Sequence, residues 1–271
     1  MTTKLLGALA LCAAVCGTVS ADVTSANTVG FTTVNLEAGK WYMIVPQFTK
    51  TGVEESATFN ALDVMTFNGL KAGTYSTRNT ASPQIQVHKP SDNTYTIYYY
   101  NSDAKDAGAN VTAWATARAA VYSIPVPRYK GFWLKVTGAE DGATLTVAGQ
   151  VRDLSKPVEV EVGTEGQWQM VSNPFPCDLD IANMKVEGLV PGTYSTRNTV
   201  SPQMQVHKPS DNTYTIYYYN SDAKDAGANV TAWATARAAV TSGKICDACK
   251  GFWLKVPSGT GKLIFTMPSN N

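Results

Sequence analysis

The sequence is poor in the residues that most often carry chemistry. It has two histidines and five cysteines, and charged residues make up only 16% of the chain. It contains no Gly-rich phosphate loop, no Gly-x-Ser-x-Gly motif and no His-Glu-x-x-His motif. These gaps leave no enzyme class to assign. We therefore expect a protein that is not an enzyme and has no catalytic residues and no cofactor.

The chain also lacks an excess of either charge. Lys4 belongs to an N-terminal segment that we expect to be removed, and without it 21 of the 22 basic residues remain against 21 acidic residues. A formal net charge of zero gives no electrostatic attraction to nucleic acid or to anionic lipid. We therefore expect no nucleic-acid partner.

Long hydrophobic runs are confined to the N-terminus. The apolar run Leu5–Val19 ends in Val19-Ser20-Ala21, which places small residues where a signal peptidase reads the chain. This run is short for a membrane span, and no later run is long enough to cross a bilayer. We expect residues 1–21 to be a cleaved secretory signal peptide, and we expect no membrane insertion of the mature chain.

Internal repetition is the dominant feature of what remains. Residues 73–120 return as residues 192–239 with only two changes. Outside this block, Gly131–Val136 is identical to Gly251–Val256, but the offset between the copies differs. Loops have therefore changed length while strand-like segments have stayed, as expected of a folded unit that was duplicated.

Pro157 lies between the two copies and would interrupt strand pairing there. We therefore expect two modules, residues 22–152 and residues 153–271. Modules of about 120 residues are large enough to bury a core each.

Most segments of each copy alternate between apolar and polar residues with period two. Short aromatic and β-branched runs are separated by clusters of Gly, Pro, Asn and Asp. This pattern predicts an all-β protein of two tandem β-sandwich or jelly-roll-like modules. The segment Val111–Ala120 is ambiguous, because its alanines favour a helix while the segment also fits a strand.

A hairpin inside the repeat suggests a binding face. Alignment of the apolar positions in Gln84–His88 and Thr94–Tyr100 predicts a five-residue loop, Lys89–Asn93. Amide, hydroxyl and aromatic side chains would then share the outward face of the sheet. The expected ligand-binding residues are Gln84, Gln86, His88, Tyr98 and Tyr100 in the first module, and Gln203, Gln205, His207, Tyr217 and Tyr219 in the second.

Three accounts of this face stay open. Aromatic rings beside amides could bind carbohydrate, and two copies would add avidity. A Tyr- and Thr-rich strand of low charge is also suited to strand addition between subunits. The loops of the same module could instead cover the face, because exposed apolar patches are rare in monomers.

Three cysteines remain in the mature chain. Cys246 and Cys249 form a CxxC pair in an expected loop, where a thioredoxin-like site would need a helix N-terminus. Cys177 and His207 are the only residues of that module that could complete a zinc set with them. We expect a local disulfide between Cys246 and Cys249 or unpaired thiols, and no metal site.

The second module carries a set of motifs found together in one family. Trp168–Phe175 reads Trp-x-Met-Val-x-Asn-Pro-Phe, and Gln205-Val206, the Tyr-rich segment Tyr214–Tyr219 and Gly251–Leu254 follow it. These motifs resemble a β-domain common in secreted surface proteins of Gram-negative bacteria. The first module departs from the pattern, since Val45–Phe48 lacks the Asn-Pro pair. The resemblance covers most of the mature chain. It implies a non-catalytic protein that is periplasmic, extracellular or at the cell surface of such a bacterium.

The function that we expect is that of a non-enzymatic structural or adhesive protein, secreted or surface-associated. Its partners would be copies of itself or other surface proteins. The alternative is a carbohydrate-binding protein that uses the outward Tyr, Gln and Thr face of each module to hold a glycan. A weaker alternative is a hydrolase whose site no motif marks.

Overall fold

The computed structural model describes residues 29–50, 58–89, 91–163, 168–208, 210–211, 213–248 and 250–267. Within these ranges the protein consists of β-strands, turns and three short 3-10 turns, with no α-helix. The prediction of an all-β fold is therefore confirmed. The expected signal peptide, residues 1–21, lies outside the described residues.

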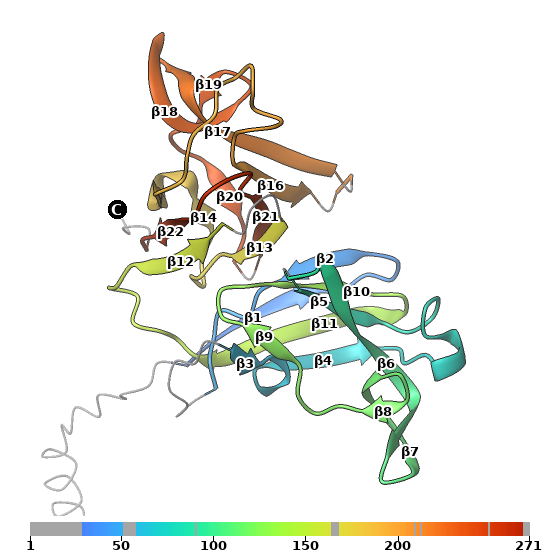
Figure 1. Cartoon of the computed structure of the whole chain (residues 1–271). Coiled ribbons are helices and arrows are strands. Elements are labelled where there is room, and N and C mark those ends of the chain that lie inside the picture. Colours follow the sequence, from blue (N-terminus) through green and yellow to red (C-terminus); the bar gives the residue numbers. More distant parts are fainter. Residues whose placement is uncertain are drawn as a thin grey trace, which may run out of the picture.

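In the first module a three-stranded sheet packs on a six-stranded sheet (Figure 1). The small sheet has the order β1–β11–β4, and the large sheet has the order β2–β10–β5–β6–β7–β8. The bounds are β1 Val29–Asn35, β2 Trp41–Ile44, β4 Met65–Leu70, β5 Gln84–Lys89, β6 Thr94–Asp106, β7 Ala109–Thr116, β8 Ala119–Ala120, β10 Phe132–Lys135 and β11 Ala139–Gln150.

The second module repeats this arrangement strand for strand. Its small sheet has the order β12–β22–β15, and its large sheet has the order β13–β21–β16–β17–β18–β19. The bounds are β12 Val158–Val162, β13 Trp168–Ser172, β15 Met184–Glu187, β16 Gln203–Lys208, β17 Thr213–Asp225, β18 Ala228–Thr235, β19 Ala238–Ala239, β21 Gly251–Lys255 and β22 Gly261–Phe265.

Each module also has a two-stranded ribbon beside a 3-10 turn. β3 (Thr58–Asn60) pairs with β9 (Pro125–Pro127), and β14 (Leu179–Asp180) pairs with β20 (Lys244–Cys246). β3 and β14 lead directly into η1 (Ala61–Asp63) and η3 (Ile181–Asn183), and η2 (Tyr75–Thr77) lies after β4. Every one of these sheets draws its strands from a single copy of the repeat.

Alternating side chains of the two sheets fill a separate core in each module. Phe132 of the large sheet and Leu145 of the small sheet are fully buried in the first core. Phe252 and Leu263 hold the corresponding positions in the second core. Burial of an aromatic or leucine side chain stabilises a fold by about 1.5–3 kcal/mol. The period-two pattern of the sequence therefore has its cause in these two cores.

The ambiguous segment Val111–Ala120 is a strand, a turn and a further short strand. β7 pairs with β6, the chain turns at Ala117 with a left-handed φ of 49°, and β8 follows. Trp114 is buried against Phe67 and Tyr100, with ring centroids 5.3 Å from each. Strand pairing and burial of this indole outweigh the helix propensity of the alanines, which amounts to tenths of a kcal/mol for each residue.

The predicted register of the hairpin is wrong by one residue. β5 ends at Lys89 and β6 begins at Thr94, so the loop has an even number of residues, and His88 pairs with Tyr95. Ile85 then pairs with Tyr98, and both side chains enter the core. A slip of one residue turns every side chain of a strand over. The face of β6 that accompanies Gln84, Gln86 and His88 is therefore the opposite one.

A third apolar cluster joins the two modules. It lies where the outer faces of the two large sheets meet, with β2 and β13 near the junction in Figure 1. Its buried members are Met43 and Trp133 from the first module and Met170 and Trp253 from the second, with Trp41 and Trp168 packed against them.

Two glycines permit this close approach. A Cβ atom on Gly131 would lie 2.9 Å from both the Ile44 carbonyl oxygen and the sulfur of Met170. A Cβ atom on Gly251 would lie 2.5 Å from the Val171 carbonyl oxygen and 3.3 Å from the sulfur of Met43. The glycine of each Gly-Phe-Trp-Leu motif therefore lets a strand pair within its sheet while the partner module packs on it.

The segment in which the first module differs from the Asn-Pro motif also lies at the junction. The Gln47 side-chain amide donates hydrogen bonds to the backbone oxygens of Asn173 and Phe175 in the other module. Asn173 itself holds its own loop, because its side-chain oxygen accepts from Phe175 N at 3.0 Å and its amide donates to the oxygen of Cys177 at 2.6 Å. The residue that differs in the first module thus contributes a contact between modules.

Candidate functional site

The candidate site is a cleft at the junction, and it follows from strands that are apolar on both faces. In β2, Tyr42 and Ile44 face the core of their own module, whereas Trp41 and Met43 face the other module. Trp133 in β10 also points to the junction, between two core residues of the same strand. β13 and β21 arrange their residues in the same way.

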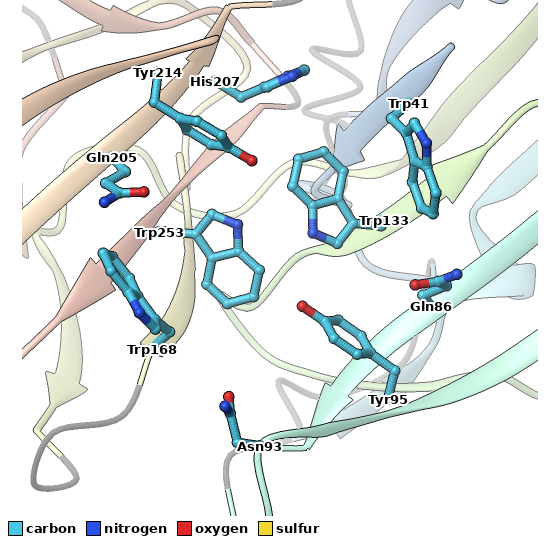
Figure 2. Close-up of a pocket in the computed structure, with 10 residues that line it drawn as sticks. All are labelled: Trp41, Gln86, Asn93, Tyr95, Trp133, Trp168, Gln205, His207, Tyr214 and Trp253. Atoms are coloured by element: carbon cyan, nitrogen blue, oxygen red, sulfur yellow. The ribbon is translucent and has the colours of Figure 1, made fainter. Parts of the chain in front are cut away.

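Tryptophans form the floor and the walls of the cleft. Trp133 and Trp253 meet across the junction with ring centroids 6.5 Å apart, and each is only 8% exposed. Trp41 stands edge-on to Trp133 at 6.2 Å. Trp168 lies on the opposite side, beside Trp253 (Figure 2). The cleft therefore offers indole surfaces from both modules.

The two histidines support this floor from each side. The His207 ring stands edge-on to Trp133 at 5.4 Å, and the His88 ring stands edge-on to Trp253 at 5.2 Å. Each histidine thus crosses the junction to contact the tryptophan of the other module. His88 is further held by Asn93, whose side-chain oxygen lies 3.0 Å from its Nε2 atom.

Two tyrosine hydroxyls face the centre of the cleft. Tyr95 in β6 and Tyr214 in β17 stand on opposite sides with their hydroxyls directed inward (Figure 2). They are 37% and 39% exposed, and neither hydroxyl has a hydrogen-bond partner within the described part of the chain. Each is therefore available to donate to, and accept from, a ligand.

Glutamine amides flank the same space. The Gln86 amide nitrogen donates to the side-chain oxygen of Gln84 at 2.8 Å, which leaves the Gln86 oxygen open to a donor. The amide of Gln205 has no hydrogen-bond partner among the described residues. Gln86 and Gln205 lie on opposite sides of the cleft in Figure 2. Because an amide carries both donors and acceptors, these groups suit a ligand rich in hydroxyls.

The tyrosine hydroxyls of the cleft carry no charge at physiological pH. Burial raises the pKa of Tyr95, and the nearby Tyr214 hydroxyl raises it further. Burial also raises the pKa of Tyr214. Both side chains therefore remain protonated donors. The ammonium groups of Lys135 and Lys255 lie over the rings of Trp41 and Trp168, at 5.4 Å and 5.8 Å.

The volume of the cleft is about 550 Å³. This value lies within the range of about 300–1,000 Å³ typical of small-molecule sites. No Asp, Glu, Lys or Arg is among the lining residues that the structure describes. These residues are Trp41, Gln86, Asn93, Tyr95, Trp133, Trp168, Gln205, His207, Tyr214 and Trp253.

The structure brings only part of the predicted set together. Gln86, Gln205 and His207 line the cleft, and His88 contacts its floor. Gln84 is buried, and its amide nitrogen lies 3.3 Å from the Arg78 carbonyl oxygen, so it holds the turn before β5. Gln203 holds the corresponding turn of the second module, 3.1 Å from the Asn198 carbonyl oxygen.

The four predicted tyrosines are not on this surface. Tyr98 is 7% exposed in the first core, and Tyr100 packs against that core beside Trp114. Tyr217 and Tyr219 pack against the second core. The one-residue error in register is the cause, because it exchanges the two faces of β6 and of β17.

Sequence reasoning missed the four tryptophans, Asn93, Tyr95 and Tyr214. A signal for the tryptophans was present, because Trp41, Met43 and Trp133 alternate with core residues that are equally apolar. A strand that is apolar on both faces is buried on both faces, as in sheets covered from two sides. That pattern indicates a second layer of packing, which here is the other module.

Cys177 and Cys246 are not among the lining residues of the cleft. Cys246 is buried with a free thiol, and burial raises its pKa well above the ordinary range. Cys177 is half-buried with a free thiol, and burial together with Asp178 raises its pKa. Cys249 lies outside the described residues. The described residues contain no group of three or more His, Cys, Asp or Glu side chains placed to hold a metal ion.

No family model, curated protein or solved structure matches this chain. The resemblance to the surface-protein β-domain therefore stays a prediction. In the described part of the chain, no helix has the length and apolar character needed to span a bilayer.

Proposed function

We propose that this protein binds a neutral carbohydrate in the cleft between its modules and does not cleave it. The observation that carries this proposal is the convergence of unpaired hydroxyl and amide groups over a floor of tryptophans. Tyr95, Tyr214 and Gln205 supply the unpaired groups, and Trp133 and Trp253 supply the floor.

Sugars match this combination of surfaces. A pyranose ring has an apolar face of C–H groups, which packs on an indole, and a rim of hydroxyls, which donate and accept hydrogen bonds. Ligand sites generally combine apolar walls with a few well-placed polar groups in this way. The two tyrosine hydroxyls and two glutamine amides are such groups, and they are held by strands rather than by loops.

We propose a neutral ligand because no Asp, Glu, Lys or Arg is among the described lining residues of the cleft. A carboxylate or phosphate group buried without a cationic partner loses hydration that the protein does not replace. The ammonium groups of Lys135 and Lys255 lie over the indole rings of Trp41 and Trp168. Glycoside hydrolysis generally uses a pair of carboxyl groups, and the described lining residues supply none. We therefore propose binding without catalysis.

A glycan-binding protein that is exported would act in adhesion. This role joins the two expectations from the sequence, a surface-associated protein and a carbohydrate-binding protein. The proposal moves the binding surface from one outward face in each module to one cleft shared by both.

A glycan array followed by calorimetric titration tests the proposal. We expect the intact mature protein to bind neutral glycans. Gln205→Ala should weaken this binding about fivefold, since a lost neutral hydrogen bond costs about 1 kcal/mol. Tyr122→Phe is the control. The Tyr122 hydroxyl donates to Asp106 at 2.6 Å, and neither residue lines the cleft. An array without a neutral-glycan signal from folded protein would sink the proposal.

A further inference from the structure

The cleft is built from pairs of matching residues, one from each module. Trp41 matches Trp168, Trp133 matches Trp253, Gln86 matches Gln205 and Tyr95 matches Tyr214 in the aligned copies of the repeat. In Figure 2 the members of each pair lie on opposite sides of the centre, and the Trp133–Trp253 contact lies between them.

The ring contacts on the two sides show how closely the two halves agree. The edge-on contact of His88 with Trp253 is 5.2 Å at 89°, and that of Trp133 with His207 is 5.4 Å at 89°. Within each module, His88 lies 5.2 Å from Tyr95 and His207 lies 5.3 Å from Tyr214. The modules are therefore related by an approximate two-fold axis that passes through the cleft.

This symmetry restricts the ligand that can use the whole site. A single sugar ring has no two-fold axis, so it can meet one tyrosine and one glutamine in the favoured geometry but not their mates. Two linked rings can place one ring on each half of the floor and meet both sets. The unpaired hydroxyls of Tyr95 and Tyr214 are then both satisfied by one ligand.

From this arrangement we infer that the cleft holds a neutral oligosaccharide of at least two sugar units in two equivalent half-sites, one from each module. The inference rests on the proposed function. Two half-sites on one chain raise the affinity for a linked ligand by about 10²–10⁴-fold over a single unit, because binding of the second unit becomes intramolecular. A monosaccharide would occupy each half-site separately and weakly.

The first test is a titration by length on the intact protein. The probes are the monosaccharide, disaccharide and tetrasaccharide of the neutral glycan that gives the strongest array signal. We expect the tetrasaccharide to bind one per chain, and the monosaccharide to bind at least about a hundredfold more weakly with two per chain. Equal affinity for monosaccharide and tetrasaccharide would overturn the two half-sites but leave carbohydrate binding intact.

A second test compares matched variants. Tyr95→Phe and Tyr214→Phe each remove one inward hydroxyl at corresponding positions. Both side chains are more than a third exposed, so we expect both variants to fold. Each should weaken tetrasaccharide binding about fivefold, and the double variant should weaken it about 25-fold. Loss confined to one of the two variants would overturn the inference. Absence of any neutral-glycan binding would overturn both this inference and the proposed function.

Discussion

The two modules meet at one junction, but they contribute to its edges differently. Lys130 of the first module lies 3.3 Å from the side-chain oxygen of Gln169, whereas the corresponding Lys250 lies over the ring of Tyr42 at 5.3 Å. Tyr42 and Gln169 occupy the same position in β2 and β13.

The tryptophans and methionines beside these residues do not differ. The copies have diverged in this region, yet Trp41, Met43 and Trp133 match Trp168, Met170 and Trp253. The side chains at the centre of the junction therefore follow the approximate two-fold symmetry, whereas those at its periphery do not. Variants made in pairs can therefore separate a shared surface from local packing.

The largest expected effect comes from the centre of the junction. Trp133→Ala and Trp253→Ala each remove an indole that contacts a histidine of the other module, and each should destabilise the protein by about 3–5 kcal/mol. Because the contacts are equivalent, the two losses should be similar in thermal and denaturant unfolding. A loss in one variant that is several-fold larger than in the other would contradict the two-fold junction.

Alanine substitutions at the two junction glycines, Gly131 and Gly251, compare how tightly the backbones of the two modules pack. Gly251→Ala would put a Cβ atom 2.5 Å from a backbone oxygen, whereas Gly131→Ala would put it 2.9 Å from one. Overpacking of this kind costs about 1–3 kcal/mol. We expect both variants to be destabilised in chemical denaturation, and Gly251→Ala more so. The reverse order would show that the modules relax differently from what these distances indicate.

Lys130, at the edge of the junction, should make the stability of the protein depend on pH. Burial lowers the pKa of Lys130 from 10.5 to about 8. The unfolded chain then holds this proton more tightly than the folded protein, so the free energy of unfolding should rise as the pH rises from 8 to 10.5.

The Lys130→Met variant measures this contribution. Wild type should gain about 1–2 kcal/mol relative to Lys130→Met across that pH range, since the side chain is partly exposed. Lys250→Met is the matched substitution, and loss of the ammonium contact with the Tyr42 ring should cost about 0.5–1 kcal/mol. A difference between wild type and Lys130→Met that does not change with pH would contradict the assignment.

The smallest effect is expected far from the junction. In the second module the half-buried Lys262 lies 2.8 Å from Glu159 and 3.3 Å from Glu161, whereas the corresponding strands of the first module carry Thr and Asn. Surface ion pairs of this kind contribute little and are screened by salt. Lys262→Ala should shift the unfolding midpoint less than any variant above, and the shift should vanish at high salt. A shift that persists there would indicate a structural role for Lys262.

The sequence was sufficient for the fold class but not for the face of the sheet. Ile85 and Val87 alternate with polar residues in Gln84–His88, and such alternation predicted a β-strand that the structure confirms. In Tyr95–Tyr100, however, both faces are apolar. The register then depends on packing with Trp114 and with the other module, which are distant in sequence.

The cleft could be predicted even less well. Its tryptophans come from β2, β10, β13 and β21, strands that are far apart along the chain. Their doubly apolar pattern indicates burial on both sides but does not identify the covering layer. Gln86 and Gln205 were found because their strand was assigned correctly, while Tyr98 and Tyr217 were misplaced with the register.

Indole resonances in a proton–nitrogen NMR spectrum provide the most direct test of the central claim. Of the six tryptophans, Trp41, Trp133, Trp168 and Trp253 line the cleft, while Trp114 and Trp233 lie in the two cores. On addition of the neutral oligosaccharide selected by the array, the four cleft indole signals should shift while the two core signals stay in place. Shifts limited to the indoles of one module, or shifts of the core pair instead, would contradict a ligand site shared by both modules.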